Sequence, residues 1–181
     1  KGPWKNYYLW DLYKEGHTPF SWHKELFKYA KKLNIKIFST PFDETAVDFL
    51  ESLNCPYYKV SSFEITHLPL IKKIASKKKD MIISTGLANL KEIKTAYDTA
   101  KRYGAKKVTL LYCVSNYPSN IDDFNLMNIS LLKKKFNCEV GLSDHSLDNS
   151  ISSTAVALGA RIFEKHISLT KDKGLDSHFS L

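Results

Sequence analysis

Short runs of apolar residues alternate with longer amphipathic stretches along most of this chain. The amphipathic stretches repeat at helical spacing, and one of them places Leu26, Phe27, Ala30 and Leu33 on a single face. This spacing predicts helices at 21–33, 43–53, 68–76, 89–103, 126–136 and 149–158. The apolar runs predict strands at 35–38, 57–60, 81–83, 108–112, 139–142 and 161–163. Residues 1–20 are irregular and aromatic, with one helical turn expected at 10–13.

Capping residues sharpen the expected helix starts. Ser21 and Asp43 each precede an amphipathic stretch, as N-cap residues do. Asn89 is followed three residues later by Glu92, a spacing typical of a capping box. The starts of these helices are therefore predicted from local chemistry as well as from periodicity.

The regular alternation of strand and helix predicts right-handed βαβ units and a parallel sheet. Two α/β architectures fit it: an open doubly wound sheet, or a (β/α)8 TIM barrel that is incomplete here, with six βα units and two missing. No Gly-x-Gly-x-x-Gly follows the first strand, which weakens the dinucleotide-binding version of the open sheet. Polar residues end every predicted strand, and barrels assemble their chemistry at that rim. We therefore predict the incomplete barrel.

Composition limits the class of protein. The 181 residues suffice for one domain, and 43% of them are hydrophobic, as in globular proteins. We expect no membrane segment and no signal peptide, because no apolar run approaches about 18 residues. Three cysteines without Cys-x-x-Cys spacing favour a reducing, cytoplasmic setting over a disulfide or zinc framework. The chain begins without methionine, so we expect an excerpt of a longer protein.

The net charge of +8 has two interpretations. It indicates either a lysine-rich solvated surface or a nucleic-acid-binding module. Only Arg102 and Arg161 are arginines, and nucleic-acid recognition relies on arginine, so we favour the surface and expect no nucleic-acid partner. A positive field would still attract an anionic substrate.

The residues at the predicted strand ends supply the candidate chemistry. They comprise one cation, five hydroxyls, two histidines and four carboxylates: Lys59; Thr40, Ser62, Ser84, Ser115 and Ser143; His145 and His166; Glu64, Asp144, Glu164 and Asp176. Hydroxyls with a lysine suit a phosphate or carboxylate, and paired histidines suit Mn²⁺ or a similar ion acting as a Lewis acid. This set indicates lyase or transferase chemistry on a phosphorylated carboxylate and a carbonyl compound.

Strand alternation predicts how these groups converge, although each also has a structural interpretation. Ser143 and His145 share one strand face, as do Glu164 and His166, so neighbouring strands about 4.8 Å apart would bring the two imidazoles together. A histidine at a strand end is commonly a hydrogen-bonded structural residue. A serine or threonine after a strand is commonly the cap of the next helix, and Glu64 has the same interpretation. The pair of histidines leaves the metal and structural interpretations both open.

Five short segments contain most of these strand-end residues: Phe38–Ser39–Thr40–Pro41–Phe42–Asp43, Tyr58–Lys59–Val60–Ser61–Ser62–Phe63–Glu64, Ile83–Ser84–Thr85–Gly86, Gly141–Leu142–Ser143–Asp144–His145 and Glu164–Lys165–His166. Together they resemble the sialic acid synthase family. The resemblance runs in order from about residue 10 to the end. Members of this family condense phosphoenolpyruvate with an N-acetylated amino sugar to make nonulosonic acids.

The N-terminal segment narrows the resemblance. Leu12–Tyr13, Thr18–Pro19–Phe20 and Trp22–His23, with the tail at 174–181, are similar to the branch that makes pseudaminic acid, although Phe20 stands where that branch has Trp. The implied sugar is 2,4-diacetamido-2,4,6-trideoxy-altrose. The neuraminic and legionaminic branches share the core motifs and stay as alternatives.

The resemblance also implies a role for each rim residue. His145 and His166 match ligands of a divalent metal, Mn²⁺ or Mg²⁺, with Asp144 and Glu164 as carboxylates that orient the imidazoles. The phosphoenolpyruvate contacts implied are Thr40, Lys59, Ser62, Ser84, Ser115, Ser143 and His145, and the sugar contacts implied are Glu64, Tyr117 and Asp176. His145, His166, Lys59 and Glu64 are the expected catalytic residues. Some members have Asn at position 115, and a role for Ser62 requires a bend after Val60.

The resemblance further implies parts that this chain lacks. These are the first two βα units, so that the six units would be strands 3–8 of the barrel, and a small C-terminal antifreeze-like (SAF) domain that reaches across a homodimer. We expect the 181-residue chain alone to be inactive. A non-catalytic barrel fragment is the alternative from a different class.

Overall fold

The computed structural model describes residues 4–171 and 174–181, which contain seven α-helices and five strands. The helices are α1 (Leu9–Gly16), α2 (Phe20–Lys32), α3 (Glu44–Ser52), α4 (Leu68–Ala75), α5 (Leu90–Arg102), α6 (Met127–Phe136) and α7 (Asn149–Ala157). The strands are β1 (Tyr57–Val60), β2 (Asp80–Ser84), β3 (Val108–Cys113), β4 (Glu139–Asp144) and β5 (Phe163–Lys165). Short 3₁₀ turns lie at η1 (Ser62–Glu64), η2 (Ile121–Asp123) and η3 (Ser177–Phe179).

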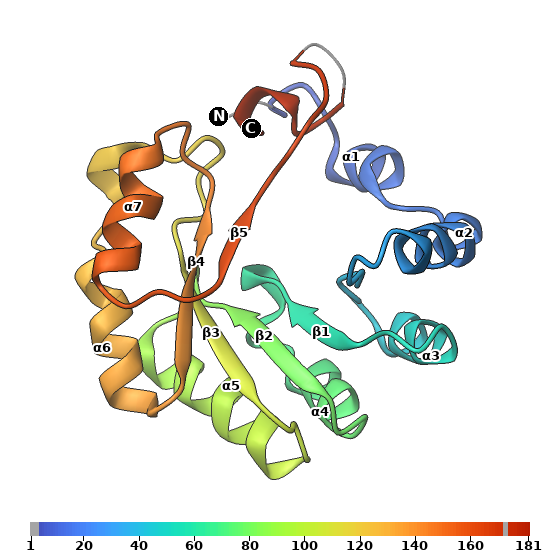
Figure 1. The fold of residues 1–181 in the computed structure, drawn as a ribbon, viewed down its shortest axis with the longest axis horizontal. Coiled ribbons are helices and arrows are strands. Elements are labelled where there is room, and N and C mark those ends of the chain that lie inside the picture. The colour runs from blue at the N-terminus through green and yellow to red at the C-terminus, as the bar shows by residue number, and fades with distance from the viewer. Residues whose placement is uncertain (1–3, 172–173) are drawn as a thin grey trace.

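The strands form one parallel sheet in the order β1-β2-β3-β4-β5. Figure 1 shows the sheet curling around a common centre, with α4 to α7 outside it and α1 to α3 continuing the curve beyond β1. Because all strands run the same way, their carboxyl ends lie at one rim. The predicted incomplete barrel is confirmed in this curled parallel sheet.

The predicted strand at 35–38 is wrong, so the described sheet has five strands rather than six. Among the described residues, no backbone hydrogen bond joins 36–40 to β1. The segment is held beside β1 by side chains instead, with the rings of Phe38 and Tyr57 4.7 Å apart. An edge segment with a neighbour on one side only is positioned by such packing without completing a ladder.

Local signals placed most helix starts but not all. Asp43 accepts a hydrogen bond from the Ala46 amide at 2.8 Å, and Asn89 with Glu92 forms the expected capping box. Ser21 does not cap α2, which begins at Phe20 after Pro19. The single turn expected at 10–13 is a longer helix, α1, with no buried residue.

The core lies between the sheet and the helices outside it. It is built from aliphatic side chains, among them Ile71 and Ile74 of α4, Leu110 of β3, Ile129 of α6 and Leu142 of β4, all fully buried. Burying such side chains is the main favourable contribution to folding. The core therefore fixes the outer face of the sheet, and the inner face is left for the polar groups described below.

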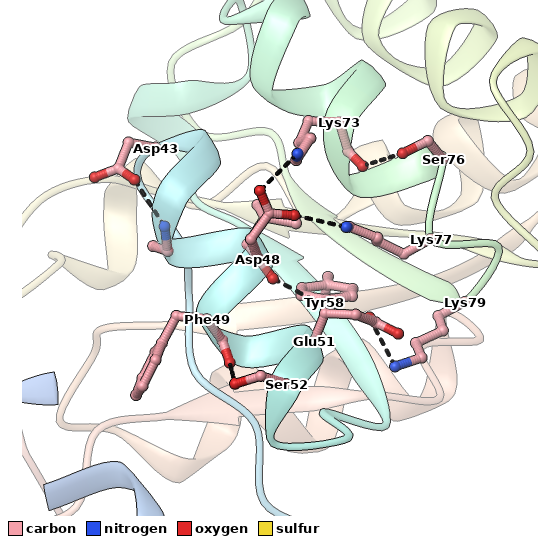
Figure 2. A network of polar contacts seen from close by, with 12 residues as sticks. Asp43, Asp48, Phe49, Glu51, Ser52, Tyr58, Lys73, Ser76, Lys77 and Lys79 are labelled. Carbon is pink, nitrogen blue, oxygen red and sulfur yellow. Dashed lines mark hydrogen bonds and ion pairs between the residues drawn. The ribbon is translucent and has the colours of Figure 1, made fainter. Parts of the chain in front are cut away.

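Lysines on the outer surface tie α3 to its neighbours, as Figure 2 shows. Asp48 of α3 lies 2.7 Å from both Lys73 and Lys77, and Glu51 accepts hydrogen bonds from Tyr58 of β1 and from Lys79. Part of the positive charge is thus paired at the surface. None of the described helices is long and apolar enough to cross a membrane.

Candidate active site at the carboxyl rim

The two edge strands of the described sheet meet across its hollow face. Lys59 of β1 lies 3.4 Å from a carboxylate oxygen of Glu164 on β5, and the Ser143 hydroxyl of β4 donates to the same carboxylate at 2.7 Å. The Lys59 side chain is only 5% exposed, whereas Glu164 is 36% exposed. This contact can form only because the sheet curls, and it places the lysine on the inner face of the curled sheet.

The next residues along β4 and β5 point the other way. Asp144 pairs with Lys165 at 2.8 Å and also accepts from Ser152 of α7 at 2.8 Å. Burial alone would raise the pKa of Asp144, but hydrogen bonds from Lys165, Ser146 and Ser152 outweigh it and hold that pKa below its usual value. The expectation that Asp144 orients an imidazole is wrong, because its carboxylate faces the helices.

The two predicted histidines do converge. Their ring centroids are 5.3 Å apart at the ends of β4 and β5. His145 Nδ1 lies 2.9 Å from the Val114 carbonyl, and His166 Nδ1 lies 3.1 Å from a carboxylate oxygen of Asp176. A carbonyl or carboxylate oxygen accepts, so Nδ1 carries a proton in both contacts, and in the neutral form of each ring Nε2 has the lone pair. The orienting groups are thus Val114 and Asp176, and the expectation that Glu164 orients an imidazole is wrong.

The arrangement of the two imidazoles is compatible with a metal ion bound between them. Paired imidazoles held through Nδ1, each with a lone pair on Nε2, are the usual form of histidine metal ligands. Within 4–171 and 174–181, no group of three or more His, Cys, Asp and Glu residues is placed to hold a metal. The pair therefore supplies two ligands, and the remaining positions would fall to water, substrate or residues outside the described chain.

Small polar groups gather between the ends of β1, β2 and β3. Ser62 begins the turn η1, which provides the bend required after Val60, and its hydroxyl accepts from the Gly86 amide at 3.0 Å. The Ser84 hydroxyl is buried and has no hydrogen-bond partner among the described residues. A side chain on Gly86 would reach 2.3 Å from the Ser115 hydroxyl, so only glycine fits this close approach. A buried hydroxyl that has no partner in the described structure can donate a hydrogen bond to an anionic ligand.

Cys113 joins this cluster and was not predicted. Its sulfur lies 3.6 Å from the Ser115 hydroxyl. Burial alone would raise the pKa of the thiol, but contacts with His145, Ser115 and Ser62 lower it. Burial alone would likewise lower the pKa of His145, yet Cys113 and the Val114 carbonyl raise it. The sequence signal for Cys113 was its place directly after the predicted strand at 108–112. In the structure it pairs with Ser143 in the register of β3 and β4.

Aromatic rings cover one side of the histidine pair. Tyr117 lies 4.2 Å from the His145 ring and 5.1 Å from Phe179 of η3. Burial, followed by the charges of Cys113, Glu164 and Asp176, raises the pKa of Tyr117 to about 12. The phenol therefore stays protonated at neutral pH and can donate a hydrogen bond.

Two predicted residues form no hydrogen bond or ion pair with the other predicted residues of the described rim. Thr40 is half-buried and makes no hydrogen bond among the described residues. Glu64 accepts a hydrogen bond from Ser61 and does not cap α4. A groove of about 520 Å³ runs between the loops after β2 and β3. It adjoins the hydroxyl cluster, because Gly86, Cys113 and Ser115 line it.

The sheet is parallel and curled, and it carries a lysine, hydroxyls and paired histidines at its carboxyl rim. This is the arrangement found in α/β-barrel enzymes. The chain belongs to the NeuB family, which matches residues 1–181. This confirms the resemblance to the sialic acid synthases.

Individual relatives agree with the family. The chain is 44% identical over 179 residues to pseudaminic acid synthase of Helicobacter pylori, covering 98% of this chain and 53% of that protein. It is 46% identical over 158 residues to N,N'-diacetyllegionaminic acid synthase of Campylobacter jejuni, covering 86% and 47%. The chain thus spans about half the length of the curated relatives it matches.

The solved structures agree with the sequence relatives. N-acetylneuraminic acid synthetase of Leptospira borgpetersenii, in complex with citrate, superposes with a TM-score of 0.87 at 34% identity, covering 91% of this chain and 58% of that one. A phospho-2-dehydro-3-deoxyheptonate aldolase of Thermotoga maritima, 15% identical with a TM-score of 0.75, shares the fold.

Proposed function

We propose that this chain carries the phosphoenolpyruvate side and the metal ligands of a synthase that condenses phosphoenolpyruvate with an N-acetylated amino sugar. The observation that carries the proposal is the buried Lys59 ammonium, facing Glu164 and Ser143 across the barrel within reach of the histidine-bearing strands. The names of the relatives, all synthases of nonulosonic acids or their phosphates where named by activity, support the reaction class.

The chain's own groups divide the work. Lys59, with the hydroxyls of Ser62, Ser84, Ser115 and Ser143, would bind the phosphate and carboxylate of phosphoenolpyruvate as charge-assisted donors. To bind phosphoenolpyruvate, Ser143 and Lys59 would break their contacts with the Glu164 carboxylate. Glu164 is half-exposed, so water can hydrate its carboxylate instead. Tyr117 would donate a hydrogen bond to the sugar from its protonated phenol.

His145 and His166 would hold a divalent cation, Mn²⁺ or Mg²⁺, through their Nε2 atoms. When bound there, the cation supplies Lewis acidity toward the sugar aldehyde. The reaction joins the methylene carbon C3 of phosphoenolpyruvate to the aldehyde carbon, whose oxygen becomes a hydroxyl. Water adds at C2, and phosphate leaves by cleavage of the bond between C2 and the phosphate oxygen.

Pseudaminic acid is the product we favour. The pseudaminic acid synthases match 98–99% of this chain, including the N-terminal aromatic segment, whereas the legionaminic acid synthases match 82–86%. Phosphate release by the full-length protein should be greatest with 2,4-diacetamido-2,4,6-trideoxy-altrose. Preference for N-acetylmannosamine or the legionaminic precursor would refute the pseudaminic product but not the reaction class.

The His145→Ala variant tests the metal-dependent step. It removes a ligand worth several kcal/mol of transition-state stabilisation, so kcat/KM should fall about a thousandfold or more. His67→Ala is the matched control, because His67 is exposed and its side chain caps no helix. Undiminished turnover of His145→Ala would exclude the two-histidine site. A wild-type protein that binds neither Mn²⁺ nor phosphoenolpyruvate would instead be a non-catalytic barrel.

The homodimer, the cytoplasmic setting and the antifreeze-like domain of the whole protein stay predictions. Light scattering of the full-length protein would test the dimer.

A further inference from the structure

The last residues of the chain fold back onto His166. Asp176 accepts from its imidazole, and the Leu181 amide donates to the His166 carbonyl at 2.9 Å. Ser180 is buried, and its hydroxyl donates to the Asp176 carbonyl at 2.7 Å. Both the backbone and the side chain of His166 are thus held by residues that follow it by ten positions or more.

Phe179 fixes the same imidazole from another side. It is only 1% exposed, and its ring meets that of His166 at 4.9 Å and 72°, an edge-to-face contact. Because Phe179 is buried, it cannot touch a substrate. Its contact with His166 is therefore one of packing.

Trp4 holds this segment from the other end of the chain. Its indole N–H donates to the Leu175 carbonyl at 3.0 Å, next to Asp176, and its ring lies 5.7 Å from Phe179. Figure 1 shows η3 beside the dark blue segment that precedes α1. Residues more than 170 positions apart thus share one contact above the rim.

The two histidines differ in how they are held. His145 is 4% exposed and bonds to Val114, whose carbonyl directly follows β3. The His166 side chain is 33% exposed, and Asp176 is 50% exposed. The first imidazole is set by the sheet, whereas the second depends on the segment at 174–181.

We propose that Asp176, Phe179 and Trp4 are positioning residues that orient His166 and thereby set the affinity of the histidine pair for a divalent cation. This deepens the proposed function and rests on it. It differs from the sugar contact that the family resemblance implied for Asp176, because it acts before any sugar binds.

Mn²⁺ titration of the full-length protein without substrate tests the proposal, with free Mn²⁺ measured by electron paramagnetic resonance. Asp176→Asn keeps the size of the side chain but removes its charge, so the hydrogen bond from His166 is no longer charge-assisted, and Mn²⁺ binding should weaken about 10–100-fold. Trp4→Phe removes the indole donor and reduces the ring that packs on Phe179, but leaves Asp176 in place, so it should weaken binding less. Asp122→Asn, an exposed carboxylate with the same charge change, is the control.

A second readout separates positioning from general loss of structure. With Co²⁺ in place of Mn²⁺, Asp176→Asn should change the visible absorption of the site while its thermal unfolding stays close to that of the wild type. Mn²⁺ affinity and Co²⁺ absorption equal to the wild type in Asp176→Asn would overturn the positioning role and leave the proposed function intact. A wild type that binds neither metal would overturn the metal site itself.

Discussion

A lysine–carboxylate pair lies on each face of the curled sheet, and the two pairs differ in burial. The outer pair joins β4 to β5, and the inner pair joins β1 to β5. On the outer face, Lys165 and Asp144 lie 2.8 Å apart, with side-chain exposures of 16% and 1%. On the inner face, Lys59 and Glu164 lie 3.4 Å apart, with exposures of 5% and 36%. In the first pair the carboxylate is sealed in, whereas in the second the cation is buried and its partner reaches solvent.

The difference lies in how completely each set is satisfied. Asp144 is also bonded by the Ser146 amide and the Ser152 hydroxyl, which leaves it little capacity for another ligand. The inner face keeps a Ser84 hydroxyl that has no partner within 4–171 and 174–181, and a longer ion pair that an incoming anion can replace. Satisfied groups stabilise the fold, and groups left unsatisfied in a buried rim are suited to binding.

Breaking the outer pair should have the largest effect. Lys165→Met leaves the Asp144 carboxylate buried without its cation, so the free energy of unfolding should fall by about 3–5 kcal/mol. Urea denaturation measures this. Lys94→Met is the control, because Lys94 is 61% exposed and its loss should change stability by about 0.5 kcal/mol or less. Equal effects of both variants would show that the outer pair is no more than a surface contact.

Breaking the inner pair should cost activity rather than stability. Lys59→Met removes the central cation of the proposed phosphoenolpyruvate site, and kcat/KM should fall about 100–1,000-fold, as when a preorganised donor is lost. The half-exposed Glu164 can be hydrated, so unfolding should change far less than in Lys165→Met. Steady-state kinetics on the full-length protein measure the loss, with the exposed Lys91→Met as control. A large loss of stability with normal kinetics would assign Lys59 a structural role.

Two serines give the smallest and most closely matched test. Ser152→Ala removes a hydrogen bond to buried Asp144 and should destabilise the fold by about 1.5–3 kcal/mol. Ser84→Ala removes a hydroxyl without a described partner, so stability should hold or rise, while the KM for phosphoenolpyruvate rises about tenfold or more. If Ser84→Ala were the more destabilising of the two, the distinction between the faces would fail.

Much of this site follows from patterns that act over a few residues. Strand alternation predicted that Ser143 shares a face with His145, and Glu164 with His166, so that the imidazoles converge. In the structure Ser143 pairs with Glu164 in the register, and the two imidazole centroids lie 5.3 Å apart. The strand at 35–38 was predicted wrongly, because an apolar run resembles a strand whether or not its backbone completes a ladder.

The partners of the imidazoles could not be predicted in the same way. Asp144 and Glu164 are next to the histidines in sequence, yet Val114 and Asp176 hold the rings. Val114 contributes a backbone carbonyl, which no residue type reveals. Asp176 and Trp4 come to the rim only where the two ends of the described chain meet.

The sequence by itself determined the α/β alternation, the family and the two histidines that converge at the rim, because periodicity, capping and motif are properties of short stretches. Only the tertiary structure decided which carboxylate meets which cation. That choice depends on the curl of the sheet, which brings β1 to β5, and on the closing of the C-terminal segment over His166. Contacts between residues far apart in the chain depend on how the whole sheet closes, and no local pattern encodes them.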